Sequence, residues 1–318
     1  MRVLITGGAG FIGSHYVRRL LAHSPTTVLT VVDKLTYAGD PRNLPDDHPR
    51  LTFVKGEVCD GDLLEDVVPG HDAVVHFAAE SHVDRSLSGA GAFVRTNVLG
   101  TQTLMESCLR AGTQRIVHVS TDEVYGSIEA GTWDEGQPLS PNSPYAASKA
   151  GGDLVALAYH RSHGLPVTVT RCSNNYGPYQ FVEKLVPRFV TRLLTGQDVP
   201  LYGDGRQVRE WLHVDDHCRA VDLLLERGEP GEVYHIGGGA ELTNRDLVTR
   251  LLELCGTDWS RVSPVADRKA HDRRYALDST KLRHLGFEPG TPFDTGLAET
   301  VRWYQDNEWW WRPHMRHV

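Results

Sequence analysis

The sequence contains little of what a disulfide framework or a thiolate metal site requires. Only five of the 318 residues are cysteine, and they lie far apart at positions 59, 108, 172, 218 and 255. No two of them form a C-x-x-C pair, so neither a disulfide scaffold nor a cysteine-ligated zinc site is predicted. Free thiols persist in reducing compartments, and we therefore expect the protein in the cytoplasm.

Long apolar runs and dense basic blocks are also missing. A transmembrane helix needs roughly 20 consecutive apolar residues, and no such run occurs. Glycines at 7, 8, 10 and 13 interrupt the apolar stretch near the N-terminus, so no signal peptide is predicted. The 33 basic residues are outnumbered by 41 acidic ones, giving a net charge of −8. Phosphate backbones would repel such a chain, which argues against a nucleic-acid-binding function.

The pattern of strands and helices predicts an α/β fold. Hydrophobic residues make up 40% of the chain, which is ordinary for a globular protein and excludes disorder as its main state. Alternation of strands with helices predicts a doubly wound, mainly parallel Rossmann-type sheet. Predicted strands are Val3–Thr6, Thr27–Val32, Thr52–Lys55, Ala73–Phe77, Arg115–Ser120 and Val167–Arg171; predicted helices are Phe11–Ala22, Phe93–Ala111 and Pro144–His163.

The alternation of predicted strands and helices becomes less regular near residue 172, which predicts a second, smaller lobe. We expect domains over residues 1–172 and 173–318, with a segment near 211–225 returning to the first. Asn174, Asn175, Gly177 and Pro178 indicate a loop at the boundary. Beyond it we expect helices Lys184–Leu194 and Asn244–Leu254, strands Pro200–Tyr202 and Val233–Ile236, and surface or interface packing for Trp309–Trp311.

A glycine-rich turn follows the first predicted strand. Gly7, Gly10 and Gly13 give a Gly-x-x-Gly-x-x-Gly pattern before a helix, which allows a pyrophosphate to approach the backbone. Asp33 ends the second strand 20 residues after Gly13, where a carboxylate accepts hydrogen bonds from ribose hydroxyls and repels a 2′-phosphate. Together these features favour NAD over NADP, although Lys34 beside Asp33 weakens the argument. Alone, the glycines are also compatible with a tight turn and Asp33 with a solvated strand end.

Two groups of side chains are candidates for the chemistry. Tyr145 and Lys149 lie four residues apart on a predicted helix, so they share one face. An ammonium nearby lowers the pKa of a phenol, and the tyrosinate can then take a proton from a substrate hydroxyl. Asp122 and Glu123 point to opposite faces if the strand continues, but both face one cleft if the chain turns after Ser120. Two such carboxylates can serve as base and acid in an elimination; otherwise they form a solvated acidic turn.

These motifs resemble the extended short-chain dehydrogenase/reductase superfamily and, within it, the dTDP-glucose 4,6-dehydratase family. Four segments carry the closer resemblance: residues 76–86 (HFAAESHVDRS), 120–126 (STDEVYG), 171–185 (RCSNNYGPYQFVEKL) and 271–275 (HDRRY). The resemblance implies an NAD-dependent lyase that dehydrates dTDP-glucose to a 4-keto-6-deoxy sugar, for rhamnose or other deoxysugars. It also implies a homodimer, with helices Phe93–Ala111 and Pro144–His163 pairing across a two-fold axis.

The resemblance assigns roles to individual positions. Tyr145, with Lys149 and Thr121, would act at the sugar 4-hydroxyl; Glu123 would take the C5 proton, and Asp122 would protonate the leaving 6-hydroxyl. The implied NAD-binding residues are Gly7, Gly10, Phe11, Ile12, Gly13, Asp33, Lys34, Thr36, Glu57, Val58, Ala78, Ala79, Thr96, Tyr145, Lys149 and Asn175. The implied substrate-binding residues are Ser81, Thr121, Asn174, Lys184, Leu185, Pro200, Tyr202, Arg209, Asn244, Arg268 and His271, with Arg209 and Arg268 as the cations for the diphosphate.

The sequence departs from the family pattern at three places and leaves other hypotheses open. Glu57 replaces the usual Asp beside the adenine, Val182 replaces a proline, and Lys269-Ala270 replaces Pro-Gly. A 4-epimerase of the same superfamily would need Tyr145 and Lys149 but not the two acids, and a catalytically silent NAD sensor would need neither pair. His213 and His217 have helical metal-ligand spacing, but a strand end followed by a helix start explains them more simply, and no metal is predicted.

Overall fold

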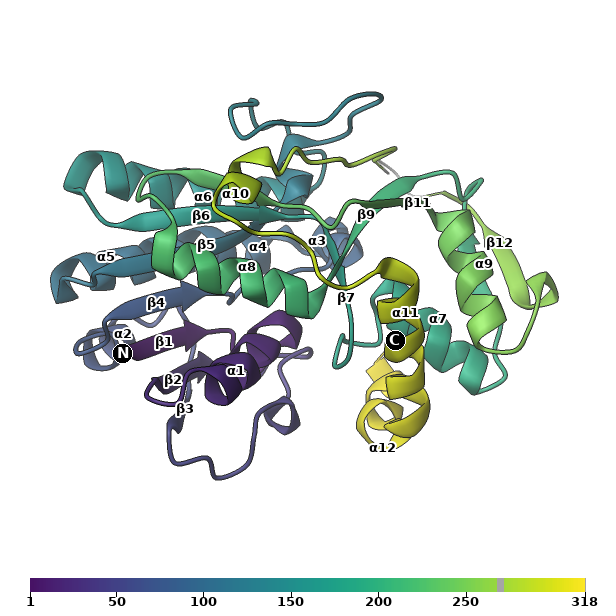
Figure 1. Ribbon diagram of the computed structural model, residues 1–318, viewed down its shortest axis with the longest axis horizontal. Coiled ribbons are helices and arrows are strands. Elements are labelled where there is room, and N and C mark those ends of the chain that lie inside the picture. Colours follow the sequence, from purple (N-terminus) through teal and green to yellow (C-terminus); the bar gives the residue numbers. More distant parts are fainter. Residues whose placement is uncertain (268–271, 318) are drawn as a thin grey trace.

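The computed structural model describes residues 1–267 and 272–317. Its large sheet has seven strands in this described part, all parallel, in the order β10-β6-β5-β4-β1-β2-β3 (Figure 1). The order reverses between β1 and β4, which places a crevice at the carboxyl ends of these strands. The strands are β1 (Arg2–Thr6), β2 (Val28–Asp33), β3 (Leu51–Lys55), β4 (Ala73–His76), β5 (Arg115–Thr121), β6 (Val167–Cys172) and β10 (Val233–Ile236). The predicted doubly wound α/β fold is therefore confirmed.

Helices cover both faces of this sheet. On one face α1 (Phe11–His23) packs against α8 (Val214–Arg227); the other carries α2 (Gly61–Val67), α5 (Thr101–Ala111) and α6 (Pro144–His163). Helix α6 has the predicted bounds because Ser143 caps its start, with its hydroxyl accepting from the N–H of Ala146 at 3.1 Å, and Gly164 ends it in a left-handed conformation. Short α3 (Val83–Ser88) and α4 (Ala90–Val94) precede α5.

The predicted helix Phe93–Ala111 is not one regular helix. A wider π-helical segment, Arg95–Gly100, lies between α4 and α5. Gly100 explains part of this irregularity, since a Cβ there would lie 2.6 Å from a methyl carbon of Val58. The irregular segment thus brings the backbone close to the loop after β3.

The smaller lobe combines two short sheets with helices around a separate apolar core (Figure 1). Its strands are β7 (Asn174–Tyr176), β9 (Val208–His213) and β11 (Ala240–Thr243) in one sheet, and β8 (Val199–Tyr202) with β12 (Val262–Val265) in the other. Its helices are α7 (Leu185–Leu194), α9 (Asn244–Leu254), α11 (Phe293–Asp306) and α12 (Glu308–Trp311), while α10 (Thr280–His284) packs beside β10.

The boundary between the two lobes differs in detail from the prediction. The loop predicted at Asn174 and Asn175 is wrong in part, because β7 pairs in parallel with β9, a partner that local sequence does not reveal. Segments beyond residue 172 also return to the large sheet: β10 joins its edge, and Leu212, Val214 and Cys218 pack in the core beneath α1. The division at residue 172 itself stays a prediction.

The tryptophan cluster near the C-terminus joins the lobes, as the packing interpretation anticipated. Trp310 and Trp311 are fully buried, while Trp309 is 57% exposed. The indole N–H of Trp310 donates to Asn43 Oδ1 at 2.7 Å, and Asn43 in turn donates to the carbonyl of Ala9 in the glycine turn. Within the described residues, no helix has both the length and the apolar character needed to cross a bilayer.

Candidate active site

The glycine turn leaves room for a ligand against its backbone. Gly7 has φ of +71°, and a Cβ on it would lie 2.5 Å from the amide nitrogen of Ala78. A Cβ on Gly13 would lie 2.3 Å from the carbonyl oxygen of Gly7, so neither position accepts a side chain. Helix α1 begins at Phe11 with no side-chain cap at Gly10, and its free N–H groups remain available to an anion. This cradle fits a pyrophosphate.

Asp33 stands where a ribose ligand is expected, at the end of β2. Its two carboxylate oxygens accept hydrogen bonds from the backbone N–H groups of Ala9 (2.9 Å) and Leu35 (2.8 Å). These contacts fix the carboxylate beside the glycine turn, and burial raises its pKa. A carboxylate has about four lone-pair positions, so acceptor capacity remains for a ribose hydroxyl.

Glu57 joins two cations at the rim of the same region. One carboxylate oxygen contacts Lys34 Nζ, and the other lies 2.9 Å from Arg95 Nη2. These two hydrogen bonds lower the pKa of Glu57. The glutamate thus holds Lys34, the residue that weakened the argument for NAD, in an ion pair at the rim, although Glu57 shares its single charge between Lys34 and Arg95.

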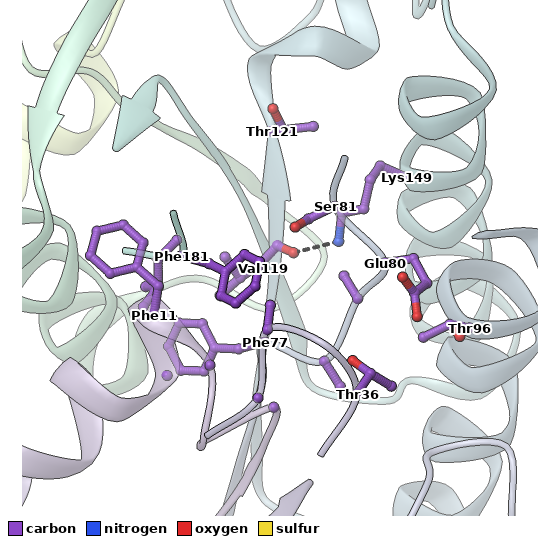
Figure 2. A pocket seen from close by; sticks show the side chains of 18 of the residues that line it. Phe11, Thr36, Phe77, Glu80, Ser81, Thr96, Val119, Thr121, Lys149 and Phe181 are labelled. Atoms are coloured by element: carbon purple, nitrogen blue, oxygen red, sulfur yellow. Dashed lines mark hydrogen bonds between the residues drawn. The ribbon is translucent and has the colours of Figure 1, made fainter. Parts of the chain in front are cut away.

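One cavity of about 310 Å³ connects the turn to the candidate catalytic residues. Figure 2 shows Phe11 and Phe77 on one side and Thr36, Glu80 and Thr96 on another. All the predicted catalytic and cofactor-binding residues line this cavity, and so do the substrate residues Ser81, Asn174 and Lys184. The predicted catalytic and cofactor-binding residues therefore surround one space.

Tyr145 and Lys149 lie on the first turns of α6, both buried. Lys149 Nζ donates to the carbonyl oxygen of Val119 at 2.7 Å (Figure 2), and burial lowers the pKa of Lys149. The expectation that the ammonium lowers the pKa of Tyr145 is not met in this structure. Burial raises the pKa of Tyr145 above its ordinary value, and the charge of Glu123 raises it further, while a hydrogen bond to Thr121 opposes this.

Asp122 and Glu123 follow β5 on a short 3₁₀ turn, Asp122–Tyr125, so the chain does turn near the predicted point. The strand ends at Thr121, whose hydroxyl accepts from the N–H of Glu123 at 3.3 Å, and Gly126 closes the turn with φ of +81°. Both acids line the cavity. Asp122 is 1% exposed, and its Oδ2 has no hydrogen-bond partner in residues 1–267 and 272–317.

The two acids have different environments. Burial, followed by the negative charges of Glu123 and Glu210, raises the pKa of Asp122 well above its ordinary value. The environment of Asp122 therefore favours the protonated form more than water does. Glu123 is only half-buried. Adjacent carboxyl groups in unlike environments are the arrangement that separates a general acid from a general base.

The remaining predicted substrate residues that the structure describes do not line this cavity. Arg209 on β9 donates to the carbonyl of Asp272 at 2.9 Å, and its guanidinium lies 4.3 Å from the centre of the Tyr275 ring. Asn244 begins α9 and is buried. Leu185, Pro200 and Tyr202 are on α7 and β8, and Arg268 and His271 lie outside the described residues, as do Lys269 and Ala270.

Several cavity residues received no role from the sequence. Phe77 and Phe181 supply aromatic walls, and Val119 supplies the carbonyl that holds Lys149. All three lie beside residues that were assigned roles, at strand ends or in the quoted segments. The sequence could therefore have pointed to these three residues only through their position next to assigned residues. Their contribution to the cavity depends on contacts between distant parts of the chain.

The histidine pair does not have the geometry of a helical metal site. His213 ends β9, and its Nδ1 accepts from the N–H of Asp215, so it caps α8. His217 lies inside α8, with Nδ1 2.9 Å from Asn175 Oδ1. Among the described residues, no group of three histidine, cysteine or acidic side chains is placed to hold a metal ion.

Comparison with known proteins extends over nearly the whole chain. The family model described as GDP-mannose 4,6 dehydratase matches residues 4–300. A dTDP-glucose 4,6-dehydratase from Streptomyces antibioticus is 62% identical over 319 aligned residues, covering 98% of this chain and 95% of the relative.

Solved structures of both a dehydratase and a 4-epimerase resemble this chain, and the dehydratase is the more similar of the two. The dTDP-glucose 4,6-dehydratase DesIV from Streptomyces venezuelae, crystallised with NAD, superposes with a TM-score of 0.97 at 61% identity, covering 99% of this chain and all of that one. The UDP-glucose 4-epimerase from Thermus thermophilus superposes with a TM-score of 0.89 at 33% identity, covering 96% of this chain and all of that one.

Proposed function

The chain belongs to the dTDP-glucose 4,6-dehydratase family, and from this premise we propose how its own residues divide the steps of the reaction. The protein is a hydro-lyase that uses NAD to convert dTDP-glucose to dTDP-4-keto-6-deoxyglucose.

The cavity fits the cofactor at both of its ends. The glycine turn takes the pyrophosphate at the start of α1, and Asp33 takes the adenosine ribose. Asn175, Tyr145 and Lys149 surround the opposite end. When bound, oxidised NAD brings positive charge into the cavity, accepts a hydride from C4 and later returns it to C6.

Tyr145 acts first, as the base for the sugar 4-hydroxyl. Its phenolate accepts the hydroxyl proton while the C4 hydrogen departs as hydride, and a C4 ketone forms. Burial opposes ionisation of this phenol, so the base function depends on nearby positive charge. The ammonium of Lys149, one helical turn further along α6 and held by the carbonyl of Val119, does not by itself offset burial, so the charge of bound NAD would supply the remainder.

The two acids act in the second step. The C4 ketone acidifies the C5 hydrogen, and Glu123 removes it as a proton. Asp122, whose raised pKa favours the protonated form, gives its proton to the departing 6-hydroxyl, which leaves as water. Reduction at C6 and reprotonation at C5 complete the 4-keto-6-deoxy sugar, so the net change is loss of one water.

The observation that carries this proposal is the burial of Asp122 beside Glu123, which raises the pKa of Asp122. An epimerase has no step that needs a proton from Asp122, and a silent NAD sensor has no use for the intact Tyr145–Lys149 pair. Incubation with dTDP-glucose, followed by mass spectrometry and by NMR spectroscopy to distinguish the C4 epimers of equal mass, separates the three. We expect a product lighter by one water; a C4 epimer or unchanged sugar would overturn the proposal.

We expect Asp33→Ala to weaken NAD binding and to relax discrimination against NADP by about tenfold or more, because the ribose then loses a charged hydrogen-bond partner. Binding of each cofactor can be measured by titration of intrinsic tryptophan fluorescence. Asp72→Ala is a matched control, since this carboxylate accepts from the backbone N–H of Arg2 far from the cavity. Equal discrimination in variant and parent would show that Asp33 is not the ribose ligand.

We also propose a homodimer formed through the predicted helices. Four large apolar side chains are exposed on α3, α4, the π-helical segment and α6: Leu87, Val94, Leu99 and Leu154, each 45–55% exposed. Burial of such a patch between two copies would remove it from water. Light scattering at micromolar concentration is expected to give twice the mass of 35.4 kDa. Leu154→Glu should shift the population toward the monomer, and a monomeric parent would contradict the proposal.

A reducing compartment such as the cytoplasm remains our proposal for where the enzyme works. All five thiols, which lie in the described part of the chain, are free, and burial raises the pKa of Cys108, Cys172 and Cys218. Raised thiol pKa values favour the unreactive protonated form.

A further inference from the structure

The turn that carries both acids ends in a buried tyrosine. Tyr125 is 4% exposed, and its ring stacks on Trp133 with the centroids 5.3 Å apart. Its hydroxyl lies 2.6 Å from Arg171 Nη1 and 2.6 Å from His235 Nε2. The turn is therefore attached at its far end to two strands of the large sheet, β6 and β10.

The direction of these hydrogen bonds follows from their last member. His235 Nδ1 lies 3.0 Å from the carbonyl oxygen of Asp278, which can only accept, so Nδ1 carries the hydrogen. Burial lowers the pKa of His235 to about 4, so the ring is neutral and Nε2 accepts. The hydroxyl of Tyr125 thus donates to His235 and accepts from Arg171, and its orientation is determined on both sides.

Arg171 is itself held by a buried ion pair. Its Nε donates to Asp153 Oδ2 at 2.9 Å, and both side chains are almost fully buried. Asp153 lies on α6, four residues after Lys149, and its negative charge raises the pKa of Lys149 against the effect of burial. One ion pair therefore connects the helix of Tyr145 and Lys149 to the turn of Asp122 and Glu123.

The turn also makes hydrogen bonds close to the two acids within the described chain. The N–H of Glu123 donates to the Thr121 hydroxyl at 3.3 Å, the N–H of Gly126 to the carbonyl of Glu123 at 3.2 Å, and the N–H of Ser140 to the carbonyl of Val124 at 3.0 Å. A four-residue 3₁₀ turn has weaker internal hydrogen bonds than an α-helix. The anchor at Tyr125 therefore contributes to the orientation of the two acids.

We propose that Tyr125 and Arg171 are positioning residues for the elimination step, holding the Asp122–Tyr125 turn so that both acids reach the sugar. This inference rests on the proposed function and names the residues that serve its second step. Displacements of about 1 Å at a reacting group can cost about 100-fold in rate. Tyr145 and Lys149 are fixed by α6 and by Val119, so the first step does not depend on the hydroxyl of Tyr125.

The test is Tyr125→Phe, which removes one oxygen and keeps the ring stacked on Trp133. We expect the enzyme to oxidise C4 at a rate within about threefold of the parent, seen as an NADH absorbance transient. Dehydration and exchange of the C5 hydrogen in deuterated water should both slow about 10- to 100-fold. A purely structural role would slow the two steps together, with a matching fall in Tm.

A second variant and a control keep the outcome interpretable. Arg171→Lys keeps a positive charge near Asp153 but cannot donate to Asp153 and Tyr125 in the same fork geometry, so elimination should slow more than C4 oxidation, which responds only through Asp153 and Lys149. Tyr234→Phe removes a buried hydroxyl on β10, one that accepts from the N–H of Glu229 at 3.2 Å, and should leave both steps unchanged. Unchanged elimination in Tyr125→Phe, or equal slowing of both steps, would overturn the inference. Failure of the parent to make the keto sugar would instead overturn the proposed function.

Discussion

Glu123→Gln is expected to lower the rate of dehydration by about 10²–10⁴-fold while hydride transfer from C4 continues, because only elimination uses the base. This loss corresponds to about 3–5 kcal/mol of barrier. Stopped-flow absorbance should show NADH forming and then persisting. Mass spectrometry of sugar recovered from deuterated water should show no deuterium at C5.

Asp122→Asn tests the partner acid with a different signature. The C5 base remains, so exchange at C5 can continue, but the 6-hydroxyl lacks its proton donor and dehydration falls by a similar factor. The raised pKa of Asp122 also predicts how the rate of elimination in the parent enzyme depends on pH. A raised pKa keeps Asp122 protonated to a higher pH than usual, so elimination is lost as pH rises through that pKa. Asp122→Asn should remove this limb of the pH profile.

The matched control for this pair is Glu232→Gln. Glu232 accepts from Lys281 Nζ at 2.6 Å and does not line the cavity, so its loss tests for a general effect of removing negative charge. Near-parental dehydration by Glu123→Gln would show that the acid–base assignment is wrong and would strengthen the epimerase alternative.

Tyr145→Phe is expected to stop the reaction one step earlier. Without the phenol, the 4-hydroxyl has no base, so oxidation should slow about 10²–10⁴-fold and no NADH transient should appear. The same stopped-flow measurement distinguishes this variant from Glu123→Gln, in which NADH accumulates. NAD binding, followed by tryptophan fluorescence, should show that the cofactor site is retained.

Tyr176→Phe is the corresponding control for loss of a buried phenol. Its hydroxyl donates to the carbonyl of Phe293 at 3.3 Å in the smaller lobe, away from the acids and α6. We expect normal NADH formation and decay in this variant. A normal transient in Tyr145→Phe would mean that another group deprotonates the 4-hydroxyl.

The elements that the sequence predicted well depend on local signals. Buried strands such as β1 and β6 are short apolar or β-branched runs, and the Gly7–Gly13 pattern can only be satisfied by a tight backbone turn at Gly7 and Gly13. Helix α6 has a Ser143 cap, Pro144 and a terminal Gly164, so its bounds follow from residues at its own ends. The spacing of Tyr145 and Lys149 then places them on one face.

The glycine turn, Asp33 and the family resemblance predicted the candidate cofactor residues, and all of them line one cavity. Tertiary structure decided what local spacing left open. Whether Asp122 and Glu123 share a cleft depended on the turn after Thr121, and the raised pKa of Asp122 depends on burial and on Glu123 and Glu210, of which Glu210 is 88 residues away.

The other features that the sequence left open depend on residues that lie far apart in the chain. These features are the joining of β10 to the large sheet, the pairing of β7 with β9, and the ion pair of Lys34 with Glu57. The hydrogen bonds of Tyr125 reach 46 and 110 residues along the sequence. The sequence by itself determined the residue types, the local turns and which side chains share one face of a helix. Only the tertiary structure determined which charged groups are buried together, because desolvation and hydrogen bonding depend on neighbours in three dimensions.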